Sequence, residues 1–272
     1  MVRKFLRGGY LGLLLTFLYA PIVVMIVLSF NASKSRAKWG GFSLQWYQKL
    51  FTDTAILDAL WLTLRVALIA TVVATILGTL AAIGIHAMKK KRANVLMSVS
   101  YLPMTTPDIV TGVSLMLMFV FVFGLVYRVS VAIGHPVQLS LGFGTMLMAH
   151  IAFDTPYVLF SVMPKLKQMN VNLYEAALDL GCPPLKAVRK VILPEIMPGV
   201  VTGALLSFTM SLDDFVISYF TSTTDNNLSM IIYSAARRGI DPSIYALSTL
   251  MFLAVLVLLI IINKRSALEN VS

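Results

Sequence analysis

Residues 172–194 read NLYEAALDLGCPPLKAVRKVILP, a charged segment between two long apolar stretches of the chain. Asn172 stands where a helix N-cap is expected, and Glu175 follows it by three residues, which is the spacing of a capping box. Gly181 has the place of a helix C-cap, and Pro183-Pro184 suit the first turn of a new helix. The segment therefore predicts two short helices joined by a tight turn, the second over 185–193.

The second predicted helix has one apolar and one basic face. Helical spacing puts Leu185, Val188 and Ile192 on the first face and Lys186, Arg189 and Lys190 on the second. We therefore expect a structured hairpin on the membrane surface, within a loop over 165–198. A chance amphipathic hairpin that merely caps two spans is the alternative.

The hairpin has the spacing of a known motif. The motif consists of Glu175-Ala176-Ala177, three intervening residues, Gly181, and Leu193-Pro194 at the end. It resembles the EAA loop of binding-protein-dependent ABC importer permeases. The family usually has Ile where this chain has Val191. The resemblance implies that Glu175, Ala176, Ala177 and Gly181 form a short element that docks into a groove of an ATPase subunit.

Composition excludes an ordinary soluble domain. The chain is 58% hydrophobic and 12% charged, with a mean hydropathy of +0.84. Charge-free runs longer than the roughly 20 residues that cross a bilayer recur along it. They predict one all-α membrane domain over 1–272 with spans at 9–31, 66–88, 93–127, 139–163, 199–220 and 244–263. The first run has no convincing cleavage site and is interpreted as an uncleaved span.

Basic residues predict the orientation of these six spans. They cluster before the first span, after the second, between the fourth and fifth, and after the sixth: Arg3, Lys4, Arg7, Lys89, Lys90, Lys91, Arg92, Lys165, Lys167, Lys186, Arg189, Lys190, Lys264 and Arg265. Short loops rich in Lys and Arg stay cytoplasmic. Both termini are therefore expected in the cytoplasm, and the net charge of +10 indicates topology and contact with anionic lipid rather than nucleic-acid binding.

The third span is too long to be straight. Residues 93–127 contain one charge, Asp108, and as a single helix would extend about 52 Å against about 30 Å of hydrocarbon. Pro103 and Pro107 predict a break near 103–108, because each removes a donor and disfavours helix in the residue before it. Such a break marks a transport site if it is buried at membrane depth. The alternative places 93–107 on the cytoplasmic interface, with Asp108 at the entrance of the span.

Two adjacent carboxylates, Asp213 and Asp214, lie inside the fifth predicted span, near Thr209 and Ser211. Each costs about 2.5 kcal/mol or more at that depth. On a continuous helix they diverge by about 100°, so one is expected to face a cavity and the other a neighbouring helix. The predicted spans contain no Lys or Arg, so the charge calls for a partner's basic side chain, a metal ion or a cationic substrate.

His150 and Asp154 lie one helical turn apart in the fourth span. This spacing predicts a self-satisfied polar pair with a role in packing or gating, and a substrate contact is the alternative. No metal site is expected, because His86, His135 and His150 fall in different spans or loops. The single cysteine, Cys182, excludes a disulfide framework.

The excess of intramembrane Asp over Lys and Arg predicts a cationic cargo. Di- or polyammonium compounds fit this pattern, because carboxylates bind the ammonium groups and aromatic side chains contact both the ammonium groups and the alkyl stems. Trp46 and Tyr47 lie in an outward loop. They belong either to an interfacial aromatic belt or to the outer mouth of the pathway.

Taken together, further segments resemble the C-type permease of the spermidine/putrescine ABC importers. They are Ser29-Phe30-Asn31, Trp46-Tyr47, Pro107-Asp108-Ile109-Val110, Glu175 to Gly181 and Ser207 to Asp214. This resemblance implies a type I ABC importer permease in a bacterial inner membrane, with a second homologous permease, an ATPase dimer that binds ATP and Mg, and a periplasmic polyamine-binding protein. The substrate pathway would include Asp213, Asp214, Asp108, Ser211 and Trp46.

The chain is not expected to be an enzyme or to hold a cofactor itself, because it lacks a G-x-x-x-x-G-K-[ST] phosphate loop. An ion-coupled secondary transporter is one alternative, but it leaves the EAA-like spacing unexplained and no inverted repeat is visible. An ABC permease for a different small solute is another. A membrane-embedded hydrolase lacks G-x-S-x-G and H-E-x-x-H signatures.

Overall fold

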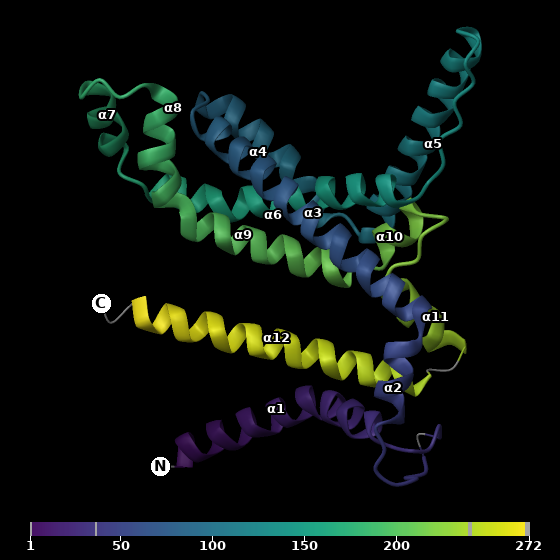
Figure 1. The fold of residues 1–272 in the computed structure, drawn as a ribbon. Coiled ribbons are helices and arrows are strands. Elements are labelled where there is room, and N and C mark those ends of the chain that lie inside the picture. Colours follow the sequence, from purple (N-terminus) through teal and green to yellow (C-terminus); the bar gives the residue numbers. More distant parts are fainter. Residues whose placement is uncertain (1, 36, 239–240, 270–272) are drawn as a thin grey trace. The chain divides into compact units, whose positions relative to one another are not determined.

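A computed structural model describes residues 2–35, 37–238 and 241–269, and the remaining positions of the predicted domain lie outside the described residues. The described chain is helical, apart from one isolated bridge between Asn31 and Phe42 (Figure 1). Its elements are α1 (Val2–Ser29), α2 (Gln45–Thr52), α3 (Thr54–His86), α4 (Lys90–Thr105), α5 (Asp108–Ala132), α6 (Phe143–Gln168), α7 (Val171–Asp179), α8 (Pro184–Ala187), the π-helix η1 (Val188–Ile192), α9 (Leu193–Asp213), α10 (Val216–Thr221), α11 (Leu228–Arg238) and α12 (Pro242–Glu269).

Within the described residues, five helices are long and apolar enough to cross a membrane: Gly9–Ser29, Thr54–His86, Asp108–Ala132, Phe143–Gln168 and Pro184–Asp213. A shorter apolar helix, Pro242–Leu253, is found at the start of α12. The prediction of an all-α, multi-pass membrane protein is therefore confirmed. Helix α3 is longer than the predicted second span: it begins twelve residues before residue 66 and therefore includes Arg65.

The chain forms two compact units, Met1–Asp58 with Ile232–Ser272, and Ala59–Ile231. In the first unit α1 packs against α12, and α2 packs against α12 as well. The loop after α1 is organised by Asn31, whose side-chain Oδ1 accepts from the backbone N–H of Ser33 at 3.1 Å and of Gly40 at 2.8 Å. The Asn31 backbone carbonyl accepts from Trp46 Nε1 at 2.6 Å.

Two of the sequence segments that carried the family resemblance thus meet in this unit. Ser29 Oγ and Tyr47 Oη are 2.8 Å apart, and the rings of Phe30 and Tyr47 are 5.3 Å apart. Trp46 is buried. These contacts fix the short helix α2 onto the end of α1, because each polar group of the pair finds its partner in the other segment.

An exposed ion pair joins α2 to the residue before α12. Lys49 Nζ lies 2.6 Å from Asp241 Oδ2. Partial burial disfavours the charged carboxylate, but hydrogen bonds from Lys49 and from the backbone and hydroxyl of Ser243 outweigh it and lower the pKa of Asp241 to about 2. The stabilisation is therefore present above the ordinary pKa of Asp and is lost as the pH falls towards 2.

The second unit is built on the pair α6 and α9, which run side by side in opposite directions (Figure 1). Glycines allow the close approach: a Cβ on Gly203 would lie 2.9 Å from the Cα of Val158, and one on Gly199 would lie 2.8 Å from the carbonyl oxygen of Ser161. Helix α3 packs on the same part of α6 through Gly78. In a membrane there is no hydrophobic driving force for helix association, so helices associate through close packing. Small residues at the interface allow this close packing.

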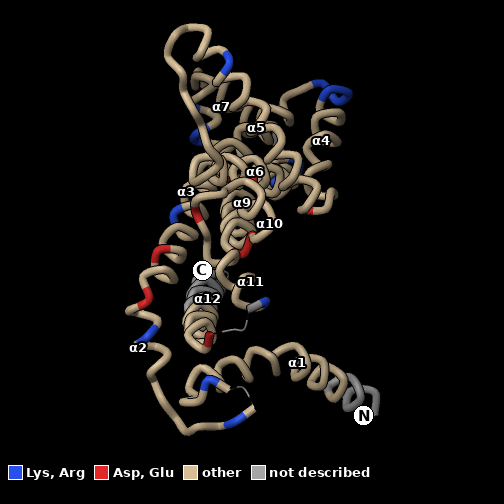
Figure 2. The backbone as a smooth tube through the Cα atoms, turned by 90° about the vertical axis from the view of Figure 1, so that its right-hand side faces the viewer, with Lys and Arg blue, Asp and Glu red and all other residues tan. Residues whose placement is uncertain are grey.

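The predicted break of the third span is confirmed, and it is short. Helix α4 continues through Pro103 to Thr105, and α5 begins at Asp108 after only Thr106 and Pro107. Helix α4 has no buried residue and does not have the length and hydropathy of a span, whereas α5 does. Figure 2 shows the basic cluster Lys89–Arg92 where α4 begins. The arrangement favours the alternative in which Asp108 opens the span, since Asp108 is exposed at the first position of α5.

The hairpin at 165–198 forms, with two corrections. Asn170 rather than Asn172 is the N-cap of α7, since its side chain accepts from the backbone N–H of Asn172 at 3.1 Å, so the predicted capping box is wrong. The C-cap prediction is confirmed: Gly181 has φ +79, and the N–H of Cys182 donates to Ala177.

The second arm of the hairpin is not a separate helix. Pro184 begins α8 as predicted, but α8, η1 and α9 form one helical run, Pro184–Asp213. Ile192 is buried, whereas Leu185 is 83% exposed, so the predicted apolar face is only partly covered in the described chain. The consequence is that α8 continues directly into α9, whereas α7 is a separate short helix joined to α6 through Met169 and Asn170.

Replacing Gly78 by alanine tests the close packing of α3 on α6. The new Cβ would lie 2.7 Å from the Cβ of Val158 and 2.8 Å from the carbonyl oxygen of Thr155, so we expect a loss of about 1–3 kcal/mol from overpacking. The measurement is thermal unfolding in nanodiscs. The matched control is Gly84→Ala on the same helix, where a Cβ meets nothing within 4 Å. Equal melting temperatures for the two variants would contradict the packing described.

Candidate functional site: a polar break at the end of α9

The adjacent carboxylates Asp213 and Asp214 lie at a helix break. Helix α9 ends at Asp213, Asp214 has extended backbone with φ −61 and ψ 123, and α10 begins at Val216. The expectation of one continuous helix over 199–220 is therefore wrong. The physical reason is that Asp214 starts a new helix: its carboxylate accepts from the backbone N–H of Ile217 at 3.2 Å and of Ser218 at 2.8 Å.

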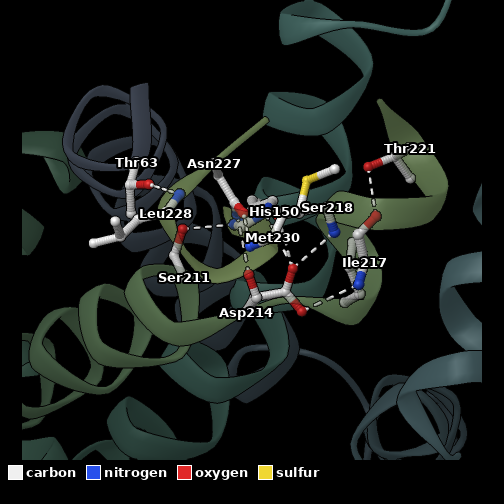
Figure 3. A network of polar contacts seen from close by, with 10 residues as sticks. All are labelled: Thr63, His150, Ser211, Asp214, Ile217, Ser218, Thr221, Asn227, Leu228 and Met230. Atoms are coloured by element: carbon white, nitrogen blue, oxygen red, sulfur yellow. Dashed lines mark hydrogen bonds and ion pairs between the residues drawn. The ribbon is translucent and has the colours of Figure 1, made fainter. Parts of the chain in front are cut away.

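His150 of α6 holds the two sides of this break together (Figure 3). Its Nδ1 is 2.6 Å from Ser211 Oγ on α9, and its Nε2 is 2.9 Å from Ser218 Oγ on α10. Nε2 is also 3.5 Å from Asp214 Oδ2. The predicted pair of His150 with Asp154 is not formed, because both ring nitrogens of His150 already face these other partners.

Asn227 closes the network from the loop that follows α10. Its Nδ2 donates to the backbone carbonyl of Asp214 at 3.1 Å and to Ser218 Oγ at 2.8 Å, and its Oδ1 accepts from the N–H of Met230 at 2.9 Å. The next residue, Leu228, donates its N–H to Thr63 Oγ1 of α3 at 2.8 Å. The break is thus tied to α3, α6 and α9, as Figure 3 shows.

The two carboxylates have different surroundings. The side chain of Asp214 is 8% exposed and accepts three hydrogen bonds, including one from Ser218 Oγ at 2.9 Å. Asp213 is exposed at the C-terminal end of α9. Asp214 therefore organises the backbone, whereas the carboxylate of Asp213 is open to a ligand.

The other predicted pathway residues fall into two groups. Ser211 is buried and bonded to His150, and Trp46 is buried and bonded to Asn31. Asp108 is exposed at the start of α5. Helix α5 packs against α10 where Gly112 approaches Phe220, a Cβ there lying 3.1 Å from the ring.

The hairpin residues are open to a partner. Glu175 and Ala176 are exposed and Ala177 is half-buried. Three leucines of the hairpin are also uncovered in the described chain: Leu173 at 50%, Leu180 at 88% and Leu185 at 83%. An exposed apolar group beside an exposed carboxylate is typical of a docking surface.

Sequence analysis missed Ser218 and Asn227. A serine in an apolar stretch was the available signal for Ser218, whereas Asn227 lies in a polar loop that looks like any turn. The described residues contain no group of three or more His, Cys, Asp or Glu side chains that could hold a metal ion.

The chain combines apolar membrane spans, a hairpin at 165–198 and a polar break after α9. Together these features define a membrane permease subunit. Residues 74–264 match the family described as "Binding-protein-dependent transport system inner membrane component", and the chain belongs to this family. It is 39% identical over 257 residues to the "Putrescine transport system permease protein PotI" of Escherichia coli (strain K12), covering 94% of this chain and 88% of that one. It is 35% identical to the "Spermidine/putrescine transport system permease protein PotC" of Haemophilus influenzae, covering 96% of each chain.

Solved structures share the fold. A chain of a bacterial ABC transporter that imports the acidic polysaccharide alginate superposes with a TM-score of 0.71 at 17% identity, covering 99% of this chain and 97% of that one. A second structure of an alginate ABC transporter, in complex with a pentasaccharide-bound periplasmic protein, gives a TM-score of 0.70 at 17% identity, over 96% and 91% of the two chains. At this identity the likeness shows the architecture of an ABC permease and nothing about cargo.

Removing the amide of Asn227 tests whether the network holds the break. Asn227→Ala leaves the carbonyl of Asp214 and the N–H of Met230 without these partners, and we expect a loss of about 1–3 kcal/mol. Thermal unfolding of the purified protein measures it. The neighbouring Asn226 is exposed, so Asn226→Ala is the matched control and should melt like the wild type. A similar shift in both variants would show that the loop, not the network, sets the stability.

Proposed function

We propose that this chain is a permease subunit of an ATP-driven importer for polyamines and that Asp213 contacts the cationic cargo. The observation that carries the proposal is the exposed carboxylate at the C-terminal end of α9, in a chain whose relatives are named as putrescine and spermidine/putrescine permeases. A helix C-terminus carries partial negative charge. Asp213 adds a full negative charge at the same point. The C-terminal end of α9 therefore favours a cation as its ligand.

Aromatic side chains at the same corner suit an alkylammonium ligand. Tyr219 of α10 is 55% exposed, and its ring centroid lies 5.4 Å from that of Phe215. Ammonium groups and the methylene groups beside them bind to such ring faces. Asp108, exposed at the start of α5, offers a second carboxylate, which suits a cargo with more than one ammonium group. The ion-coupled secondary transporter is not favoured, since the chain belongs to the ABC permease family.

The hairpin is the proposed contact with a separate ATPase dimer, which would bind ATP and Mg. Its second arm, α8, is continuous with α9, and its first arm, α7, is joined to α6 by the two residues Met169 and Asn170, so a force on the hairpin would be transmitted to the two helices that carry His150 and Asp213. The chain itself would perform no hydrolysis.

A second, homologous permease would complete the pathway, and a periplasmic polyamine-binding protein would deliver the cargo. Helix α5 offers a surface for the second permease: in its most apolar window only 11% of the residues are buried within the described chain, and Phe121 is 73% exposed. Membrane lipid would cover the apolar surface that the partner leaves free.

The proposed location is a bacterial inner membrane, with both termini in the cytoplasm. The relatives belong to an inner-membrane family. Basic residues cluster at the start of α4 (Figure 2) and in the hairpin, where the ATPase is expected, and positive loops stay on the cytoplasmic side.

Asp213→Asn tests the cargo contact. Loss of one charged interaction worth about 1.5–3 kcal/mol predicts a fall in uptake of radiolabelled putrescine and spermidine of about tenfold or more in proteoliposomes with the assembled complex. Asp58→Asn, a neutralised exposed carboxylate on α3, is the control and should transport normally. Full uptake by Asp213→Asn in an assembled complex would reject the contact, and uptake of a different solute alone would reject the polyamine class.

Glu175→Ala tests the coupling surface. Glu175 is exposed on α7, so its removal should leave the melting temperature unchanged while weakening co-purification of the ATPase and lowering transport-coupled ATP turnover severalfold. Asp179, exposed near the end of the same helix, provides the control variant Asp179→Ala. Normal coupled turnover in the Glu175 variant would contradict the assignment.

A further inference from the structure

Asp154 of α6 is a buried carboxyl group that the network of His150 and Asp214 does not use. It is 0% exposed, and neither of its side-chain oxygens has a hydrogen-bond partner. The hydroxyl of Ser207 on α9 approaches it and is also buried without a partner. Buried polar groups are nearly always hydrogen-bonded, so this pair requires an explanation.

Among the residues that the structure describes, no cationic side chain of the neighbouring helices forms an ion pair with Asp154. Between its ends α9 contains no titratable residue except Glu195 and Asp213, and residues 66–85 of α3 contain none. On α6 itself, His150 is bonded to Ser211 and Ser218, and Tyr157 is the other titratable residue within one turn.

The remaining charges that reach Asp154 have the same sign as a carboxylate. Asp214, at the break, repels a negative charge on Asp154, and Asp108 at the start of α5 acts on the neighbouring Tyr157. Helices α4 and α10 contribute the phenols Tyr101, in contact with Phe160, and Tyr219, which is exposed. A carboxylate without a counter-charge costs several kcal/mol in such surroundings.

We propose that Asp154 is a proton-binding site: the carboxyl is held as the neutral acid and donates its O–H to Ser207 across the seam between α6 and α9. One proton removes the charge that the site cannot compensate and gives the pair a second donor beside the hydroxyl of Ser207. Ionisation of Asp154 leaves the Ser207 hydroxyl as the one donor of the pair and adds a negative charge that repels Asp214, so it loosens the seam.

Asp154 lies on the pair of helices that connects to the hairpin, so its protonation affects how these two helices move against each other. The hairpin lies at one end of the α6–α9 pair, with α8 continuous with α9 and α7 joined to α6 by two residues. His150, Ser211 and Asp213 lie towards the other end of the same pair. Movement of one hairpin arm against the other therefore shears the seam where Asp154 meets Ser207. This role in coupling rests on the proposed function, whereas the bound proton does not.

Infrared spectroscopy of the full chain in nanodiscs at pH 7, wild type minus Asp154→Asn, tests the proposal. The expected result is a carboxylic-acid C=O stretching band in the wild type that the variant lacks. Ser207→Ala removes the acceptor and should shift the same band to higher frequency, which identifies the group even if the Asn variant folds poorly. Asp213→Asn, a change to the exposed carboxylate, is the control and should leave the band in place.

Thermal unfolding between pH 7 and pH 9 gives an independent readout. Raising the pH favours the carboxylate, so the melting temperature of the wild type should fall further than that of Asp154→Asn, whose amide cannot ionise. A wild-type spectrum with only carboxylate bands, or an Asn variant that is as sensitive to pH as the wild type, would overturn the proton site. Neither measurement uses transport, so failure here is distinct from failure of the polyamine assignment.

Discussion

Polar groups inside a membrane span must find their partners within the protein, and the break after α9 depends on this constraint. A helix that ends in the bilayer leaves carbonyl and N–H groups that water would otherwise bind. Here the carboxylate of Asp214 takes up the first N–H groups of α10, and Asn227 binds the Asp214 carbonyl. Without these partners the backbone groups at the end of α9 and the start of α10 would be left unsatisfied.

The break separates two carboxylates that are adjacent in sequence. The side chain of Asp214 is buried and accepts three hydrogen bonds, so its carboxylate has a structural role. Asp213 lies at the end of the helix and is exposed. One residue therefore supports the backbone so that its neighbour can present a charge. Hydrogen bonds compensate the charge of Asp214, whereas a bound cation would compensate the charge of Asp213 under the proposed function.

The close seam between α6 and α9 makes this site responsive to events at the hairpin. Gly199 and Gly203 bring the two backbones together, so the helices move as packed bodies rather than deforming singly. Because α8 runs on into α9 and α7 follows α6 after two residues, the hairpin and the polar break lie at opposite ends of one pair of packed helices. The unpartnered Asp154 and Ser207 lie along that pair, where a small change in bonding alters how the two helices slide.

Features that depend on local chemistry could be predicted from the sequence: the apolar spans, the proline break before Asp108, and the turn at Gly181, where φ is positive. The N-cap of α7 was predicted at Asn172 instead of Asn170, because the two asparagines have the same capping chemistry. The partners of His150 follow from tertiary packing alone, since they come from residues 61 and 68 positions away in the chain. A helical period places His150 near Asp154 on one face, but which neighbouring helix supplies a closer hydroxyl is a property of packing. For the same reason, no pattern in the sequence separated the structural Asp214 from the open Asp213.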